Sequence, residues 1–185
     1  MIKTRKELKE FLDLERRLYI KGGYLRELKL RFLHDSDYLI WSFIKSLRYT
    51  EYHFNKKNRL RYIIHQRRKN IKGRRLGISI YHNSIDKGLK IHHYGNIIVN
   101  KNAKIGKNCE LHGDNCIGNK GDFDRFNAPI IGDNLDLGIG AVVIGGIKLG
   151  SCITVGANAV VVKDCLTDSS TLVGVPAKCY YKLAD

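Results

Sequence analysis

The 185-residue chain is poor in residues that mark several common protein classes. Only two prolines accompany its 18 glycines, so the glycines do not belong to a Pro/Gly-rich linker. The five cysteines are odd in number and none are spaced C-x-x-C, which argues against a disulfide framework and leaves a zinc site without a ligand pattern. The N-terminus lacks the apolar stretch of a secretory signal, and the most apolar run, residues 38–44, is too short to cross a bilayer. These absences predict a reduced, cytoplasmic protein.

Positive charge is unevenly distributed along the chain. Residues 1–75 hold 22 of the 33 Lys and Arg but 8 of the 18 Asp and Glu, whereas residues 76–185 are nearly neutral. We therefore expect a basic region, 1–75, joined to a second domain, 76–185. The basic region is either a solvated cap on that domain or a surface that attracts anionic lipids or a lipid-diphosphate-linked glycan, which makes the protein membrane-peripheral. Nucleic-acid binding is not expected, because no recognised module accompanies the charge.

Helical signals fill the basic region. Thr4 and Glu7 form a capping-box pattern, followed by leucines at helical spacing up to a break at Gly22 and Gly23. A second helix is expected over 24–33, a third from Asp35 onwards, and a last basic one over 56–71.

From about residue 76 the aliphatic residues repeat every six positions. This period fits neither a helix nor an ordinary strand, and it indicates a β-helix in which three hexads form one triangular coil. Small residues four positions after the aliphatic ones are expected at the tight corners. The longest register comprises Ile131, Leu137, Val143, Leu149, Val155 and Val161.

The hexad register breaks between Ile97 and Val99 and again between Ile117 and Ile131. The second break contains a polar segment with Phe123 and Phe126. Insertions in repeat arrays are displaced as loops, often on the binding face, so this segment is either an active-site arm or a tolerated insertion.

Residues 88–100, Gly-Leu-Lys-Ile-His-His-Tyr-Gly-Asn-Ile-Ile-Val-Asn, resemble the catalytic stretch of hexapeptide-repeat acetyltransferases of the serine acetyltransferase type. Residues 155–164 and 174–178 are similar to the C-terminal signature of that superfamily. The resemblance, over residues 74–180, implies an α+β, mainly β, fold: a left-handed parallel β-helix after an N-terminal α-helical region. It also implies a homotrimer with acetyl-CoA as co-substrate in the cleft between neighbouring prisms, and no metal.

The resemblance places the catalytic histidine at His93. Transfer of an acetyl group to a hydroxyl needs a base, and a neutral imidazole serves at cellular pH. His92 is expected to point to the opposite face, because neighbours alternate in extended chain. His112 follows about one coil later, so it either stacks beside His93 and supports the reaction or is an exposed structural histidine.

One departure from the family pattern affects the acceptor. Serine acetyltransferases carry an acid about fifteen residues before the catalytic histidine, whereas this chain has Ser79 near that position. Asp86, Asp114 or a backbone carbonyl would then orient the imidazole, or the acceptor differs. The pattern is more similar to the enzymes of surface-polysaccharide gene clusters, which implies a sugar hydroxyl as acceptor. The alternatives are a serine O-acetyltransferase for cysteine biosynthesis and a catalytically silent β-helix that acts as an assembly or anion-binding module.

The family pattern also implies which residues contact the donor. Small side chains and backbone groups admit the pantetheine arm, and lysines meet the phosphates. The implied positions are Ile139, Ala157, Val162, Lys163 and Lys178.

Overall fold

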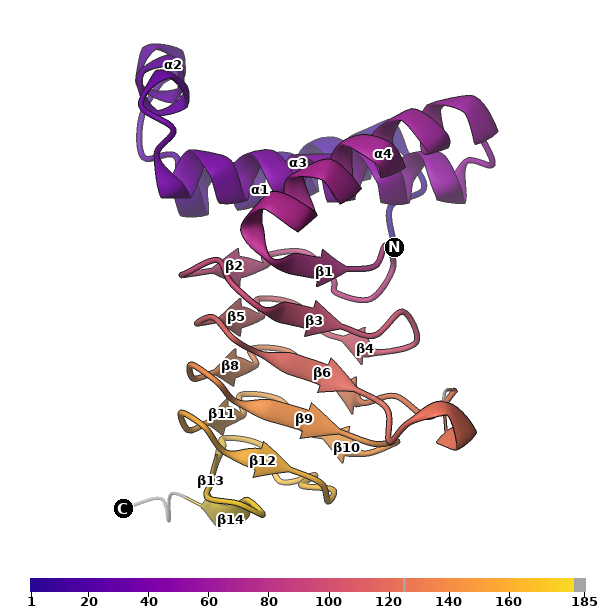
Figure 1. The fold of residues 1–185 in the computed structure, drawn as a ribbon, viewed down its shortest axis with the longest axis vertical. Helices are drawn as coiled ribbons and strands as arrows, with labels where there is room; N and C mark the ends of the chain where they lie inside the picture. The colour runs from indigo at the N-terminus through magenta and orange to yellow at the C-terminus, as the bar shows by residue number, and fades with distance from the viewer. Residues whose placement is uncertain (125, 182–185) are drawn as a thin grey trace.

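A helical cap forms the N-terminal part of the computed structural model, which describes residues 1–124 and 126–181 (Figure 1). Its helices are α1 (Arg5–Tyr19), α2 (Tyr24–Phe32), α3 (Ser36–Asn55) and α4 (Arg59–Leu76). The expected capping box is present, since Thr4 Oγ1 accepts from the Glu7 amide at 3.1 Å. The fourth helix begins and ends later than the sequence predicts, because Asn58 caps its start and Gly77, at φ +68°, ends it.

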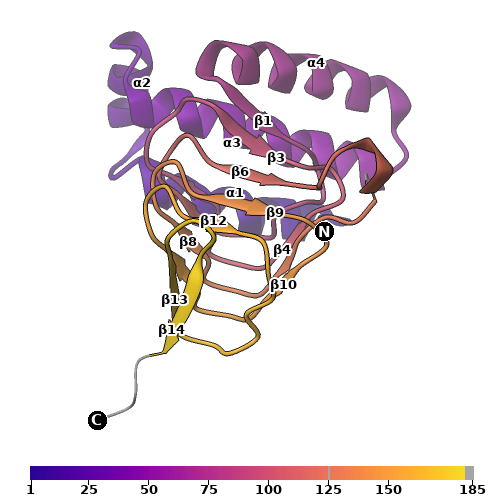
Figure 2. The same cartoon turned by 60° about the horizontal axis from the view of Figure 1, so that its bottom comes forward.

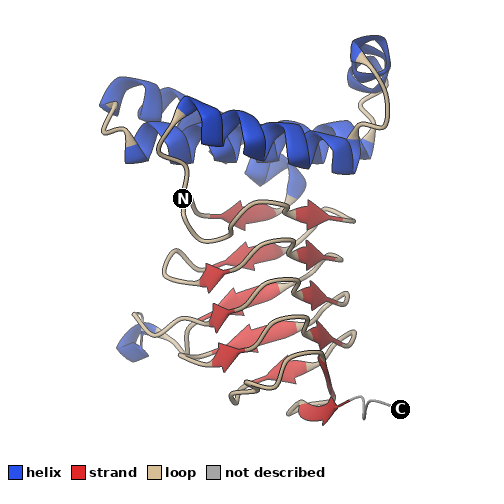
Figure 3. Cartoon of the chain, turned by 180° about the vertical axis from the view of Figure 1, so that it is seen from behind, coloured by secondary structure: helices blue, strands red, loops and turns tan. Residues whose placement is uncertain are grey.

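A stack of triangular coils follows the cap, and its strands form three faces (Figure 3). The first face contains β1 (Ile78–Ile80), β3 (Ile97–Val99), β6 (Cys116–Gly118), β9 (Val142–Ile144) and β12 (Val160–Val161). The second contains β4 (Lys104–Ile105), β7 (Ile130–Ile131) and β10 (Lys148–Leu149). The third contains β2 (Lys90–Ile91), β5 (Glu110–Leu111), β8 (Asp136–Leu137), β11 (Thr154–Val155), β13 (Ser170–Val173) and β14 (Lys178–Tyr181).

The coils wind left-handedly. In Figure 2, where the C-terminal end comes forward, the chain runs clockwise from the first face to the second and third while advancing toward the viewer. All pairings are parallel except that between β13 and β14. The predicted parallel, left-handed β-helix behind an α-helical region is therefore confirmed.

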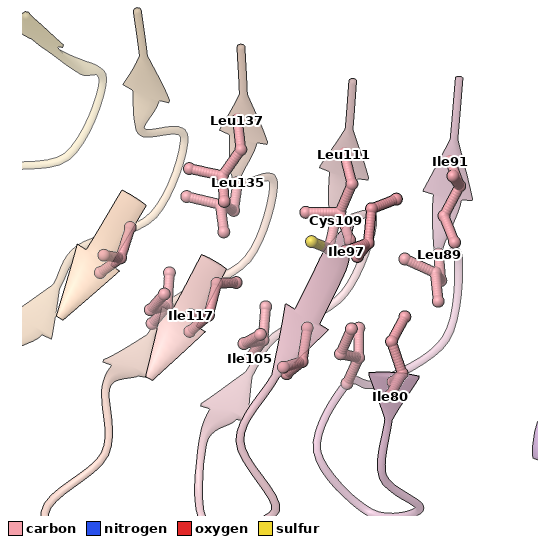
Figure 4. Close-up of a cluster of buried hydrophobic side chains, with 14 of the residues drawn as sticks. Ile80, Leu89, Ile91, Ile97, Ile105, Cys109, Leu111, Ile117, Leu135 and Leu137 are labelled. Atoms are coloured by element: carbon pink, nitrogen blue, oxygen red, sulfur yellow. The ribbon is translucent and has the colours of Figure 1, made fainter. Parts of the chain in front are cut away.

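The hexad aliphatics stack inside the prism (Figure 4). Val99, Ile117 and Val143 succeed one another in register on the first face, and each is at most 1% exposed. Ala103, Cys109 and Ala141 occupy buried corner positions, as the pattern predicts. The same core continues upward into the cap through side chains of α3, so cap and prism share one apolar interior.

A buried ion network ties the cap to the first coil. The Arg48 guanidinium, 1% exposed, contacts Glu15 at 2.6 Å and Glu51 at 3.1 Å, and it donates to the carbonyls of Ile85 and Asp86 at 2.8 Å each. Burial disfavours the charged guanidinium, but the two carboxylates outweigh this effect and raise the pKa of Arg48. The cap is therefore part of the folded unit rather than a tethered tail.

The expectation that the cysteines form no disulfide is wrong for one pair. Cys165 forms a disulfide with Cys179, although the odd count argued against such pairing. The antiparallel return of β14 alongside β13 brings residue 179 back to the last coil, and hexad spacing cannot indicate this reversal. Cys109, Cys116 and Cys152 are free. In the part of the chain that the structure describes, no helix is both long and apolar enough to cross a membrane.

Candidate active site

His93 lies in the corner formed by residues 92–96, where the chain turns from β2 on the third face to β3 on the first. Its side chain is exposed. Because Ile91 pairs with Leu111, Gly113 lies one coil below His93. Gly113 adopts φ +118°, which favours glycine, and it places no side chain beneath the histidine. The corner therefore presents the imidazole to solvent.

Tyr19 holds the strand that precedes this corner. Its hydroxyl accepts a hydrogen bond from the Ile91 amide at 2.6 Å and donates to the Leu89 carbonyl at 3.2 Å. Burial raises the pKa of Tyr19 well above 10, so the phenol keeps its proton. Lys90 Nζ adds a bond to the Leu18 carbonyl at 2.9 Å. The end of α1 thus fixes the strand that carries His93, and no motif in the sequence signalled this contact.

His112 does not lie beside His93. Its ring stacks on His92, with centroids 4.2 Å apart and planes 10° from parallel. The reason is coil length: the first full coil takes 20 residues between Ile91 and Leu111, so residue 112 falls under 92. His92 Nε2 lies 2.7 Å from a Glu110 oxygen, and His112 Nε2 lies 2.9 Å from Asp136 Oδ1.

These stacked pairs include, within the described residues, a group that a metal ion could use. The ligand atoms of His92, Glu110 and His112 lie within 4.8 Å of one another, and two imidazoles with one carboxylate suit Zn²⁺. The sequence pattern missed this group because its members belong to two different coils. Both imidazoles already have carboxylate partners, and the chemistry proposed below requires no metal there.

Asp86, Asp114 and a backbone carbonyl were the candidates to orient His93, and the structure separates the two acids. Asp114 lies on the same corner, where its carboxylate accepts from Asn96 Nδ2 at 3.2 Å. Asp86 lies next to the cap, where its carbonyl accepts from Arg48, and its carboxylate accepts from the Lys87 amide at 2.8 Å. Ser79 lies on the first face beside Ile98. Among residues 1–124 and 126–181, no acidic side chain forms an ion pair with His93.

The predicted donor contacts fall on two edges of the first face. Ile139 and Ala157 continue the vertical row of His93 and Gly113, as the registers of β5, β8 and β11 require. Lys178 pairs with Val173 at the lower end of the same edge. Val162 and Lys163 follow β12 and lie at the opposite edge, so one prism does not bring all five together.

The predicted arm also lies at that opposite edge. Ile117 pairs with Val143, a coil of 26 residues, whereas Val99 pairs with Ile117 over 18. The eight additional residues project from the prism with the short helix η1 (Asp122–Asp124), on the side away from the 92–96 corner (Figure 1). Phe123 and Phe126 are exposed, and residue 125 lies outside the described residues.

Known proteins share parts of this sequence and this fold. No family model matches the chain. Serine acetyltransferases of Helicobacter pylori J99 and Staphylococcus aureus Mu50 are each 35% identical to it, over 55% and 54% of the chain and over 60% and 47% of their own lengths. The chain therefore spans about half of the curated relatives it matches.

Solved structures extend the comparison over the cap. A soybean serine acetyltransferase apoenzyme has a TM-score of 0.77 at 23% identity, covering 95% of this chain and 69% of its own. A serine acetyltransferase in complex with CoA has a TM-score of 0.71 at 18% identity, covering 95% of this chain and 71% of its own. The class is thus the helix-capped left-handed β-helix. Within that class, the relatives that the chain resembles are serine acetyltransferases.

Proposed function

We propose that the protein is an acetyl-CoA-dependent O-acetyltransferase with His93 as its general base. The observation that carries the proposal is the shared edge: the exposed His93 stands above Ile139 and Ala157, two positions that the family pattern assigns to the donor. The similarity to serine acetyltransferases supports the reaction class and the donor.

The chain's own groups account for the proton transfers. Neutral His93 takes the proton of the acceptor hydroxyl as the new ester C–O bond forms at the thioester carbonyl carbon. The C–S bond breaks, and the imidazolium returns the proton to the leaving thiolate. Tyr19 and the first coil fix the strand before His93. This limits displacement of the imidazole from the reacting geometry, which would lower the rate.

L-serine is the acceptor that the comparisons favour. The relatives are named serine acetyltransferases, and one solved soybean structure is a complex with serine. This supports the serine O-acetyltransferase alternative over the sugar hydroxyl that the sequence pattern implied. The sugar remains a second candidate because of one observation: Ser79 stands where that family places an acid, and no carboxylate pairs with His93 in the described residues.

A thiol-release assay tests the function and the acceptor together. The full chain with acetyl-CoA and L-serine should release coenzyme A thiol above its rate without acceptor. A hydroxyl-rich sugar, such as methyl glucoside, is the matched second acceptor. Faster release with the sugar reverses the order of the two acceptors. No release with either, by folded protein, supports a silent β-helix module and contradicts the proposal.

We also infer that the functional unit is a homotrimer. The arm, Val162 and Lys163 share one edge of the first face, and His93 occupies the other, so a site that uses both edges needs two prisms. Rotational symmetry then places one chain's arm at its neighbour's corner.

Two measurements test the assembly. Light scattering should give three times the 21.1 kDa chain mass. Deleting the eight residues 120–127 should abolish turnover, as should His93→Ala, but co-expression of both variants should restore part of it. Recovery needs an interface that pairs an intact His93 with an intact arm. A monomer, or mixed trimers without any activity, would contradict the shared site.

A further inference from the structure

A cavity of about 720 Å³ opens between the cap and the corner that carries His93. Its walls come from α2, α3, α4 and the corner itself, and they include Arg31, Phe32, Tyr38, Arg75 and Tyr94. Pockets of roughly 300–1,000 Å³ hold ligands of drug size. The cavity is therefore far larger than a free amino acid such as serine requires.

The cavity adjoins the reacting corner through two direct connections. Tyr94 follows His93 in the chain and lines the cavity. At the end of α4, the Gly77 carbonyl accepts a hydrogen bond from the Ile97 amide at 2.9 Å. A Cβ on Gly77 would lie 3.0 Å from the Asn96 nitrogen, so the helix end rests directly on the corner. Arg75, in the last turn of α4, is thereby held close to it.

The charges of the cavity are all of one sign. Arg31, Lys72 and Arg75 line it, and none of its lining residues is acidic. Lys72 Nζ is engaged with Ser42 and Ser46, and burial lowers its pKa to about 8. Arg31 and Arg75 have no acidic partner among the described residues, so two permanently charged guanidiniums face the cavity unpaired.

Unpaired guanidiniums beside aromatic rings suit a particular ligand chemistry. A guanidinium binds phosphate oxygens in a two-point fashion, and the rings of Phe32 and Tyr94 offer apolar area for the rest of the ligand. Two other arginines of the cap do have acidic partners. Arg16 pairs with Glu27 at 2.8 Å, and Arg48 pairs with Glu15 and Glu51. The excess charge of the cap is therefore partly concentrated beside the corner, not only spread over its surface.

We propose that this cavity is the acceptor site and that it selects a hydroxyl acceptor carrying a phosphate, such as a phosphorylated or diphosphate-linked sugar. The assignment rests on the proposed acetyl transfer and specifies its second acceptor candidate, the sugar hydroxyl, as one that carries a phosphate. Arg31 and Arg75 bind the phosphate, and the acceptor hydroxyl reaches His93 past Tyr94.

Calorimetric titration of the full chain tests the site without requiring turnover. The probes are glucose 1-phosphate, UDP-glucose, farnesyl diphosphate, L-serine and neutral methyl glucoside. At least one phosphate probe should bind at least ten times more tightly than methyl glucoside and L-serine. A preference for UDP-glucose indicates a nucleotide-linked acceptor, and a preference for farnesyl diphosphate indicates a lipid-linked one.

Charge-removing variants assign the binding to the cavity. Arg31→Gln and Arg75→Gln should each weaken the phosphate probe about tenfold or more, the usual effect of losing a charged hydrogen bond. Arg74→Gln is the matched control, because it removes the neighbouring charge on α4 outside the cavity. An equal loss of affinity in Arg74→Gln would show that binding depends only on the overall positive charge of the cap, and it would overturn the proposal.

Two further outcomes separate this site from the proposed function. If the Arg31 and Arg75 variants weaken coenzyme A and not the phosphate probes, the cavity serves the donor and the acceptor assignment is wrong. If no phosphate probe binds while acetyl transfer to serine proceeds, the function stands and the cavity proposal fails. If His93→Ala binds the probe normally, the cavity binds its ligand independently of the base, as the proposal requires.

Discussion

The β-helix and the helical cap share one apolar interior but differ in the contacts that surround it. The β-helix repeats one rule: an inward aliphatic residue every six positions, stacked on the coil above and below. The cap adds particular polar contacts to its apolar core, above all the buried group formed by Glu15, Arg48 and Glu51. Removal of one side-chain group should therefore lower the free energy of unfolding most at the buried polar contacts of the cap, and least on the outer surface of the β-helix.

The largest stability effect is expected at the junction of the two regions. Glu15→Gln removes one carboxylate from a guanidinium that is 1% exposed. Breaking a buried ion pair in this way typically costs about 3–5 kcal/mol, because the remaining charge stays buried. Urea unfolding measures the loss. Glu10→Gln, at an exposed position of the same helix, is the control and should be nearly neutral. Equal effects of both would show that the network does not hold the cap.

A smaller loss is expected within the repeat. Leu149 is 4% exposed and packs inside the prism, so Leu149→Ala should lower the free energy of unfolding by about 2–4 kcal/mol. Its neighbour Lys148 points outward on the same strand, and Lys148→Ala should change stability by about 0.5 kcal/mol or less. These two adjacent positions test whether side chains alternate between outward and inward along the strand. A larger loss of stability in Lys148→Ala than in Leu149→Ala would contradict the observed register.

A pH effect is also expected and should belong to the cap. Burial lowers the pKa of Lys69, which is 5% exposed and donates to the Ile80 carbonyl, from 10.5 to about 8. Between pH 8 and 10.5 the unfolded chain holds a proton that the folded chain lacks, so stability should rise with pH across this window. Below pH 8 both states are protonated and the gain is absent.

Substitution identifies the source of that slope. Lys69→Met should reduce the rise in unfolding free energy between pH 8 and 10.5. The remainder includes Lys72, whose pKa is also about 8, and Lys90, whose pKa burial also lowers. Lys101→Met, in an exposed turn, should leave the slope unchanged. A slope that survives in Lys69→Met at its full size would show that Lys69 stays protonated in the fold.

The repeat was predictable because its rule is local. Six-residue spacing is enough to indicate the coils, the inward aliphatics and the position of the arm. The sequence left the neighbour of His112 open because the count assumed an 18-residue coil, whereas the first coil takes 20 and brings His112 under His92. The Cys165–Cys179 disulfide was missed because the chain reverses direction after the last coil.

The cap shows the limit of sequence patterns. Helical spacing and capping residues predict its helices, but they carry no information on which residues meet across them. The hydrogen bonds of Tyr19 to the first coil, at a sequence distance of about 70 residues, have no periodic signal. The cavity lined by Arg31 and Arg75 is likewise a product of how α2 and α4 are placed.

The most direct test of the account is the turnover of His93→Ala. If His93 is the base, the substitution should lower kcat by roughly 10²–10⁴-fold, the usual contribution of a positioned acid–base group. Acetyl-CoA affinity should stay close to that of the unchanged chain, because the proposed donor positions lie on later coils. His92→Ala, the adjacent control, should reduce kcat far less. Near-normal turnover by folded His93→Ala would contradict the account.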